Sequence, residues 1–222
     1  AEKTGDKPLQ VEVQAQLAMK CQMAATSDEL KRSVEINEKV VALAAEIGNH
    51  KARARALTNM GRSLFFLGQN DRAKEVFTQG VAFAREHDIP FFGARSLCFL
   101  GFLKTMNPDT REEGFKHLSE ATEIQQRIGD KYGEGYTYML LTNVQMQSGR
   151  FREAEASTVR YGEIMSELGS RDDATIALLN HAIVCFDQGN FERMEEIATK
   201  CHKMAGELNH KQAFPVSLAL WA

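Results

Sequence analysis

Two side chains with metal-binding chemistry, His181 and Cys185, lie four residues apart in the sequence. In a helix this spacing puts both on one face, where they can meet, and zinc prefers imidazole and thiolate ligands. A structural zinc site needs four ligands in recognisable spacing, and no second pair occurs nearby, since Cys201 and His202 are adjacent rather than on one face. We therefore predict no metal site and interpret His181 and Cys185 as core residues.

Sequence motifs of catalysis are missing from the chain. It contains no G-x-S-x-G, no G-x-x-x-x-G-K-[ST] and no H-E-x-x-H. Acidic runs such as Glu192–Glu196 are interpreted as solvated helix faces, where a carboxylate lacks the desolvation that tunes a catalytic pKa. We predict that the chain is not an enzyme and that it binds no cofactor.

Composition narrows the class of partner. A net charge of −3 and a pI near 6.1 argue against a nucleic-acid or anionic-membrane partner. No stretch approaches the roughly 20 apolar residues of a membrane span, and the polar segment Ala1–Pro8 does not resemble a signal peptide. The four cysteines show no C-x-x-C spacing, so we expect reduced, mostly buried thiols and a cytoplasmic protein.

Any functional side chains must be positioned by helices, and the ends of these helices recur along the chain at a regular spacing. A turn residue stands at the same position in each of five segments: EIGNHK, EHDIPF, RIGDKY, ELGSRD and ELNHKQ. Successive turn residues are 40, 41, 40 and 40 positions apart. These turn residues are Gly48, Asp88, Gly129, Gly169 and Asn209. Only Gly, Asn and Asp readily adopt the left-handed conformation that commonly ends a helix. Five such endings in register predict a repeat protein with units of about 40 residues.

Each unit contains a second turn near its middle. Three of these turns are a glycine followed by a new helix, at Gly68, Gly149 and Gly189. In the third unit Met106–Thr110 takes the place of the glycine and adds one residue. Between turns the apolar residues recur at helical i, i+3, i+4, i+7 spacing, and no useful length alternates with the period of a strand. Each unit is therefore predicted to be two antiparallel helices, which we name A and B.

The register also gives boundaries. We expect an N-terminal tail at 1–9 and a single repeat domain at 10–222, with units 10–50, 51–89, 90–130, 131–170 and 171–210 and a partial unit at 211–222. Thr26 with Glu29, and Thr110 with Glu113, have the spacing of capping boxes.

A known family shows a similar order of residues. The order is Leu57, Gly61, Leu64, Gly68, Ala73, Phe77 and Gly80, and it resembles the tetratricopeptide repeat (TPR) signature. The 40-residue unit is similar to the longer-helix variety found in spindle-orientation adaptors and in bacterial activators of the maltose-regulator type. The resemblance covers residues 10–222 and implies an all-α, right-handed superhelical α-solenoid of about five repeats plus a truncated sixth helix, with A helices lining its concave side.

The resemblance also implies which residues line a peptide-binding groove. Carried over position by position, the candidates are Arg55, Asn59, Arg62, Phe65, Arg95, Phe99, Phe102, Tyr136, Met139, Asn143, Met146, Asn180 and Ile183. The asparagine amides can hold an extended peptide backbone, the arginines can pair with carboxylates, and the aromatic and methionine side chains can form apolar pockets. Each type has a structural alternative: Phe65 and Phe99 as core, the asparagines as local caps, and the arginines as a solvated face.

Three functions remain open on this basis. The first is a cytoplasmic protein- or peptide-binding scaffold for signalling, whose partner carries acidic residues. The second is a sensory or regulatory segment of a larger regulator that binds a small effector or its own output domain. The third is self-association through the repeat ends, because the last helix carries Phe214, Leu218 and Trp221 on one apolar face. Because that helix looks unfinished, we expect the chain to be part of a larger protein.

Overall fold

The computed structural model describes residues 6–211 and 213–221, and these residues contain helices and no strand. The elements are α1 (Lys7–Ala24), α2 (Ser27–Glu46), α3 (His50–Phe66), α4 (Asn70–Glu86), α5 (Pro90–Thr105), the 3₁₀ turn η2 (Pro108–Thr110), α6 (Arg111–Ile128), α7 (Lys131–Gln147), α8 (Phe151–Glu167), α9 (Arg171–Asp187), α10 (Phe191–Leu208) and α11 (Ala213–Trp221). The predicted all-α fold of helix pairs is confirmed. No helix among the described residues combines the length and the apolar character that a bilayer span requires.

The turn residues predicted from their spacing adopt the backbone that ends a helix. All five have positive φ, from 51° at Asp88 and Asn209 to 72° at Gly129 and Gly169. At Gly48 the hydrogen bonds Gly48 N–H to Ala45 O and Asn49 N–H to Ala44 O close the end of α2. This pair of bonds is the Schellman pattern, which satisfies carbonyls that the last turn would leave unpaired. The midway glycines at 68, 149 and 189 have the same left-handed φ.

Two predicted helix starts differ from the structure. The Thr110 hydroxyl donates to Lys104 O instead of capping a helix, because η2 runs directly into α6 and leaves no free helix start at Thr110. Asn107 caps this segment instead, by accepting from Asp109 N–H. The first helix begins at Lys7 rather than after residue 9, because Asp6 accepts from Leu9 N–H and caps it. The cap predicted at Thr26 is present, since its hydroxyl accepts from Glu29 N–H at 3.4 Å.

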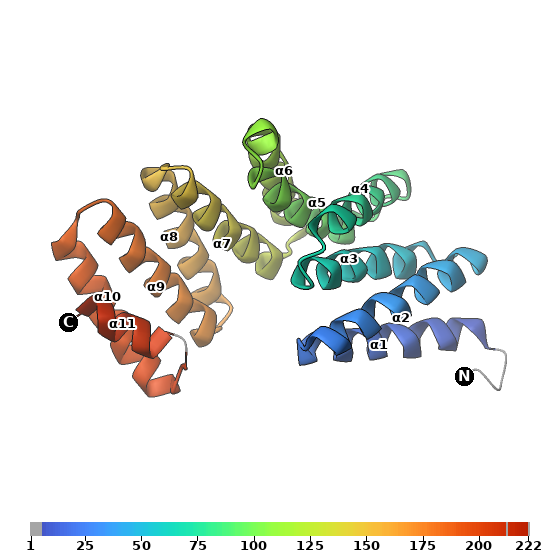
Figure 1. Ribbon diagram of the computed structural model, residues 1–222, viewed down its shortest axis with the longest axis horizontal. Helices are drawn as coiled ribbons and strands as arrows, with labels where there is room; N and C mark the ends of the chain where they lie inside the picture. Colours follow the sequence, from blue (N-terminus) through green and yellow to red (C-terminus); the bar gives the residue numbers. More distant parts are fainter. Residues whose placement is uncertain (1–5, 212, 222) are drawn as a thin grey trace. The chain divides into compact units, whose positions relative to one another are not determined.

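The chain divides into two compact units, Ala1–Ile124 and Gln125–Ala222, with the boundary inside α6. From here on, "first unit" and "second unit" mean these two parts of the chain and not the 40-residue repeat units. Within each unit the consecutive helices, from α1 to α5 and from α7 to α11, pack against each other as antiparallel neighbours (Figure 1). Helices two places apart also make contact: α1 with α3 and α3 with α5 in the first unit, α7 with α9 and α9 with α11 in the second. These are the helices named A, so each unit has a layer of adjacent A helices on which a continuous binding face can be built.

Small residues allow the helices of a pair to approach closely in the first unit. A Cβ placed on Gly61 of α3 would lie 2.5 Å from the ring of Phe77 on α4. At the next crossing, a Cβ on Gly114 of α6 would lie 2.6 Å from the carbonyl oxygen of Gly101 on α5. These glycines therefore stand where side-chain or backbone atoms of the partner helix fill the space, which fixes how A and B cross.

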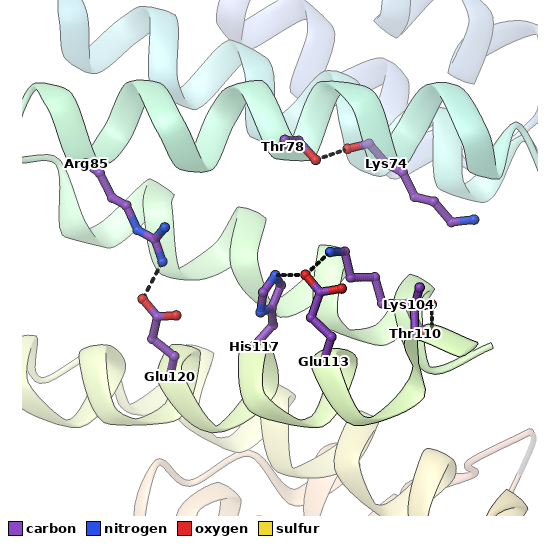
Figure 2. A network of polar contacts seen from close by, with 8 residues as sticks. All are labelled: Lys74, Thr78, Arg85, Lys104, Thr110, Glu113, His117 and Glu120. Atoms are coloured by element: carbon purple, nitrogen blue, oxygen red, sulfur yellow. Dashed lines mark hydrogen bonds and ion pairs between the residues drawn. The ribbon is translucent and has the colours of Figure 1, made fainter. Parts of the chain in front are cut away.

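A polar network joins α4, α5 and α6 on the surface of the first unit. Arg85 of α4 pairs with Glu120 of α6, with 2.5 Å between nitrogen and oxygen, and Lys104 of α5 pairs with Glu113 of α6 (Figure 2). His117 lies beside Glu113, with 3.7 Å between Nε2 and the carboxylate. Burial, and then the nearby Lys104 ammonium, lower the pKa of His117 despite the neighbouring carboxylates. The neutral imidazole is therefore favoured in the folded unit.

His117 is expected to make folding stability depend on pH. Because its folded pKa lies below the unfolded value of about 6.5, the unfolded chain binds the proton more readily, and stability falls as pH drops below about 6.5 toward the folded pKa. Urea unfolding followed by circular dichroism should show a smaller acid-side loss of stability in His117→Gln than in the wild type. Burial also lowers the pKa of His181, so part of the slope should persist. An unchanged slope in His117→Gln would show that this imidazole titrates normally in the fold.

Candidate functional site

A stripe of side chains on α3 is left outside the helix packing. Gly61 of α3 meets α4 through Phe77, and the Thr58 hydroxyl lies 2.9 Å from the Ser96 hydroxyl of α5. On another side, Ala52 and Ala56 join an apolar cluster with residues of α1 and α2. The remaining stripe is half-buried to exposed and consists of Arg55, Asn59, Arg62, Phe65 and Phe66. The predicted α3 candidates therefore do lie together along one helix.

Aromatic and cationic groups continue this stripe onto α5. The ring of Phe65 makes an edge-to-face contact with Phe102 of α5, with 5.8 Å between ring centroids. The guanidinium of Arg95 lies 4.3 Å from the ring centre of Phe91, and that of Arg62 lies 5.6 Å from that of Phe99. Such stacking holds a guanidinium in a defined place on this surface.

We call this surface the α3–α5 face. It consists of Arg55, Asn59, Arg62, Phe65, Phe66, Phe91, Arg95, Phe102 and Met106. Two of its members, Phe66 and Met106, are each 51% exposed, and Phe91 is 38% exposed. Large apolar side chains so exposed beside cations are suited to contact a partner, because apolar burial and charge pairing can occur together.

One arginine of the face already holds a carboxylate. Arg55 pairs with Glu12 of α1, with 3.0 Å between the guanidinium nitrogen and the carboxylate oxygen. Hydrogen bonds from Gln16 and then from Arg55 hold the pKa of Glu12 below its ordinary value. The Glu12 side chain is more than half exposed, so the pair contributes little to stability. An acidic ligand could therefore replace Glu12 at small cost.

The candidate asparagines differ from most polar groups of the fold in that their side-chain amides find no partner among the described residues. Within the described part of the chain, the side-chain amides of Asn59, Asn143 and Asn180 make no hydrogen bond, although all three residues are half-buried. Asn59 and Asn180 occupy the same repeat position, since each lies 11 residues after a turn glycine, Gly48 or Gly169. Their amides thus retain both donor and acceptor for a ligand, and the alternative that they cap local turns finds no support.

One predicted groove residue lies in the core instead. Phe99 is only 4% exposed, and its ring stacks on Phe77 of α4 with 5.3 Å between centroids. The exposed rings of this face are Phe66 and Phe91, which were not among the predicted groove residues. Helical periodicity identified the apolar positions of α3 and α5, but it did not show which of two neighbouring rings on a helix points outward.

The second unit carries its own candidates on α7 and α9. Met139 packs against a core cluster that contains Tyr161 and Met165, and Ile183 packs against one that contains Leu179 and Cys201. Both side chains therefore contribute to packing between helices, although each stays partly exposed. All six candidates of this unit are half-buried: Tyr136, Met139, Asn143, Met146, Asn180 and Ile183.

Comparison with known proteins bears on this arrangement of helices and faces. The profile of the tetratricopeptide repeat matches residues 54–87, which cover most of α3 and all of α4. Residues 54–87 therefore match one tetratricopeptide repeat, and the helix pairs of the chain have a TPR-like fold. No curated protein sequence matches this TPR-like chain significantly.

Solved structures agree with the repeat fold at low sequence identity. TPR-like repeats of a putative kinesin light chain from Podosopora anserina match with a TM-score of 0.70 and 18% identity, covering 92% of this chain and 98% of theirs. A signal-transduction ATPase with a tetratricopeptide repeat sensor from Pyrococcus horikoshii matches with a TM-score of 0.73 and 16% identity, covering 97% of this chain and 32% of its own. A Rap protein complexed with Competence and Sporulation Factor matches with a TM-score of 0.72 and 13% identity, covering 87% and 54% respectively. The TPR-like chain thus spans about half of the Rap chain and a third of the ATPase. At these identities the likeness shows the fold alone.

Proposed function

We propose that this TPR-like protein is a non-catalytic scaffold that binds a protein or peptide on the faces of its A helices, with the α3–α5 face as the principal contact. The observation that carries the proposal is the set of half-buried asparagine amides without internal hydrogen bonds, two of them at the same repeat position. An amide that is partly withdrawn from water and lacks a partner gains most from a ligand that supplies both a donor and an acceptor. An extended peptide backbone supplies both at every residue.

The side chains around Asn59 indicate the chemistry of the peptide. Arg55, Arg62 and Arg95 lie on the same two helices and favour carboxylates, as the Glu12–Arg55 pair already illustrates. Phe66 and Phe91 offer exposed rings beside them. The ligand we propose is therefore an extended acidic segment with apolar side chains at alternate positions.

The fold comparisons support this proposal at a coarser level. TPR-like repeats are consistent with protein-interaction scaffolds, and one neighbour of similar fold, the Rap protein, was solved in complex with Competence and Sporulation Factor. Within each unit, adjacent A helices provide a surface on which such binding could take place.

Substitutions on the α3–α5 face should weaken binding of a peptide selected from a random displayed library. Arg62→Asp is expected to reduce affinity by about tenfold or more, because it replaces the cation that pairs with a carboxylate of the peptide by another carboxylate. Asn59→Ala is expected to reduce affinity by several-fold. Fluorescence anisotropy with the selected peptide measures both effects. The same peptide should bind more weakly as salt rises, since the pairing is partly exposed.

Lys39→Asp provides the matched control. Lys39 is an exposed cation in the middle of α2, a B helix of the same unit, so its substitution changes net charge by the same amount as Arg62→Asp. Affinity should change little in this control. Equal losses of affinity in Lys39→Asp and Arg62→Asp would mean that the effect comes from overall charge and not from this face. Undiminished binding by a folded Arg62→Asp/Asn59→Ala double variant would exclude this face as the binding surface.

A second candidate function rests on one of the neighbours. The ATPase from Pyrococcus horikoshii carries its repeats as a sensor, and the match covers only 32% of that chain. Under this alternative the repeats bind a small effector or an output domain instead of a separate peptide. A thermal-shift screen with small metabolites, run beside the peptide selection, discriminates between the two, because only the sensor function predicts stabilisation by a small molecule.

A further inference from the structure

A cluster of three potential metal ligands lies in the second unit and shares no residue with the α3–α5 face. His181 and Cys185 stand one turn apart on α9, and Glu155 reaches them from α8. One ligand atom from each lies within 4.8 Å of the other two, with 3.4 Å between His181 Nε2 and Glu155 Oε1. The sequence pairs His181 with Cys185 by spacing alone, and the fold adds a third ligand from the preceding B helix.

The carboxylate of this cluster is held in place by neighbours. Gln188 Nε2 donates to Glu155 Oε2 at 3.1 Å and also to the backbone oxygen of Phe151 at 3.2 Å. Such an amide fixes the carboxylate orientation, as outer-shell partners do in metal sites. Arg193 lies on the other side, with its guanidinium nitrogen 3.2 Å from Glu155 Oε1. It is the group that balances the carboxylate charge when no metal is bound.

Two surface clefts give access to the cluster. One, of about 730 Å³, is lined by Phe151, Glu155 and Gln188 among others. The second, of about 480 Å³, is lined by His181, Arg193 and neighbouring residues of α10. His181 and Glu155 retain side-chain exposures of 12% and 23%, whereas Cys185 is fully buried beneath them. An ion in these clefts would therefore meet Glu155 and His181 first, and the Cys185 thiol, which lines neither cleft, would be its deepest ligand.

The protonation states suit a cation for two of the three groups. Burial lowers the pKa of His181 and so favours the neutral imidazole, in which one ring nitrogen carries a proton and the other a lone pair that a metal can use. Burial acts to raise the pKa of Glu155, but hydrogen bonds from Gln188 and His181 outweigh it and keep the carboxylate ionised. Burial raises the pKa of the Cys185 thiol, so an ion must displace its proton on binding.

We propose that Glu155, His181 and Cys185 form a binding site for a divalent ion of the zinc class, with a fourth position left to water or an external ligand. Three atoms no more than 4.8 Å apart leave a point within about 3 Å of each, so small side-chain rotations reach the roughly 2.0–2.3 Å of zinc bonds. The thiolate and imidazole select zinc, cobalt or nickel over magnesium and calcium, which prefer oxygen ligands. Three protein ligands with one open position is the coordination of exchangeable rather than closed structural zinc.

Titration with Co²⁺ alone tests the site in the untagged, reduced full chain. We expect one ion per chain, with visible d–d absorption and a thiolate-to-cobalt charge-transfer band in the near ultraviolet. Cys185→Ser should abolish the charge-transfer band, and His181→Gln should weaken binding by about tenfold or more. The buried thiol on α10 supplies the control, because Cys201→Ser should keep both the band and the affinity. No binding by wild type, or an unchanged band in Cys185→Ser, overturns the proposal.

Arg193→Gln separates a metal site from loss of folding. The Arg193 side chain is half exposed, so its substitution leaves the core intact, and it removes the cation that competes for Glu155. We expect this variant to bind Co²⁺ several-fold more tightly than wild type, with an unchanged circular dichroism spectrum. Weaker or equal binding by Arg193→Gln contradicts the assignment of Glu155 as a ligand. Competition by added Zn²⁺ should remove the cobalt absorption, and competition by Mg²⁺ should not.

Discussion

Gly114→Ala is expected to lower the free energy of unfolding by about 2–3 kcal/mol, although alanine is ordinarily the better helix former. The added Cβ would lie 2.6 Å from Gly101 O and 2.7 Å from Thr105 N, both backbone atoms of α5. Backbone atoms cannot rotate away, so α5 and α6 must move apart and lose contacts along their crossing. Urea unfolding followed by circular dichroism measures the loss.

Gly206→Ala is the matched control in another helix. Its Cβ would meet only the edge of the Phe214 ring, at 3.3 Å, at an exposed position near the end of α10. There the gain of about 0.5–1 kcal/mol in helix propensity should offset the small contact, so stability should stay the same or rise. If Gly114→Ala and Gly206→Ala changed the free energy of unfolding in the same direction, the α5–α6 crossing would not be as close as described.

Phe77→Ala is expected to cost about 3–5 kcal/mol, the usual range for emptying a buried aromatic site. Phe77 is fully buried, stacks on Phe99 of α5 and fills the space left by Gly61 of α3. It thus joins α4 to the A helices on both sides. Chemical unfolding should show the loss, and a cost under about 1 kcal/mol would mean that the site collapses around the smaller side chain.

A double-mutant cycle with Gly61 tests whether the glycine is required by the ring. Gly61→Ala alone should destabilise, because its Cβ would lie 2.5 Å from the Phe77 ring. In a Phe77→Leu background the shorter side chain frees this space, so the same substitution should cost less by about 1 kcal/mol or more. Additive costs would instead indicate that Gly61 is needed for backbone reasons.

The repeat fold could be predicted from sequence because its strongest signals are local. A left-handed helix ending depends on the residue at one position, so the five spaced Gly, Asp and Asn residues predicted five helix ends that the structure confirms. The predicted cap at Thr110 was wrong because a 3₁₀ turn, set by Asn107 and Pro108, comes first and changes where the helix begins. That outcome depends on a competition between two local hydrogen-bonding patterns, which spacing does not resolve.

The candidate sites were less predictable because they depend on contacts between helices. The resemblance placed Phe65 and Phe99 alike in the groove, with the core as the alternative for both, and packing against Phe77 puts Phe99 in the core. Glu155 was missed as a neighbour of His181 because 26 residues separate them and the pair forms only when α8 packs on α9. Interhelical neighbours of this kind leave no pattern in a single sequence.

Photo-cross-linking from the α3–α5 face tests the proposed scaffold function most directly. Benzoylphenylalanine is introduced in place of Phe66, exposed on α3, or in place of Glu75, exposed on the B helix α4 of the same unit. With an acidic peptide selected for binding, we expect covalent adducts from position 66, none from position 75, and loss of the adduct when Arg62→Asp is added. Adducts from position 75 and not from position 66 would contradict peptide binding on the A-helix face.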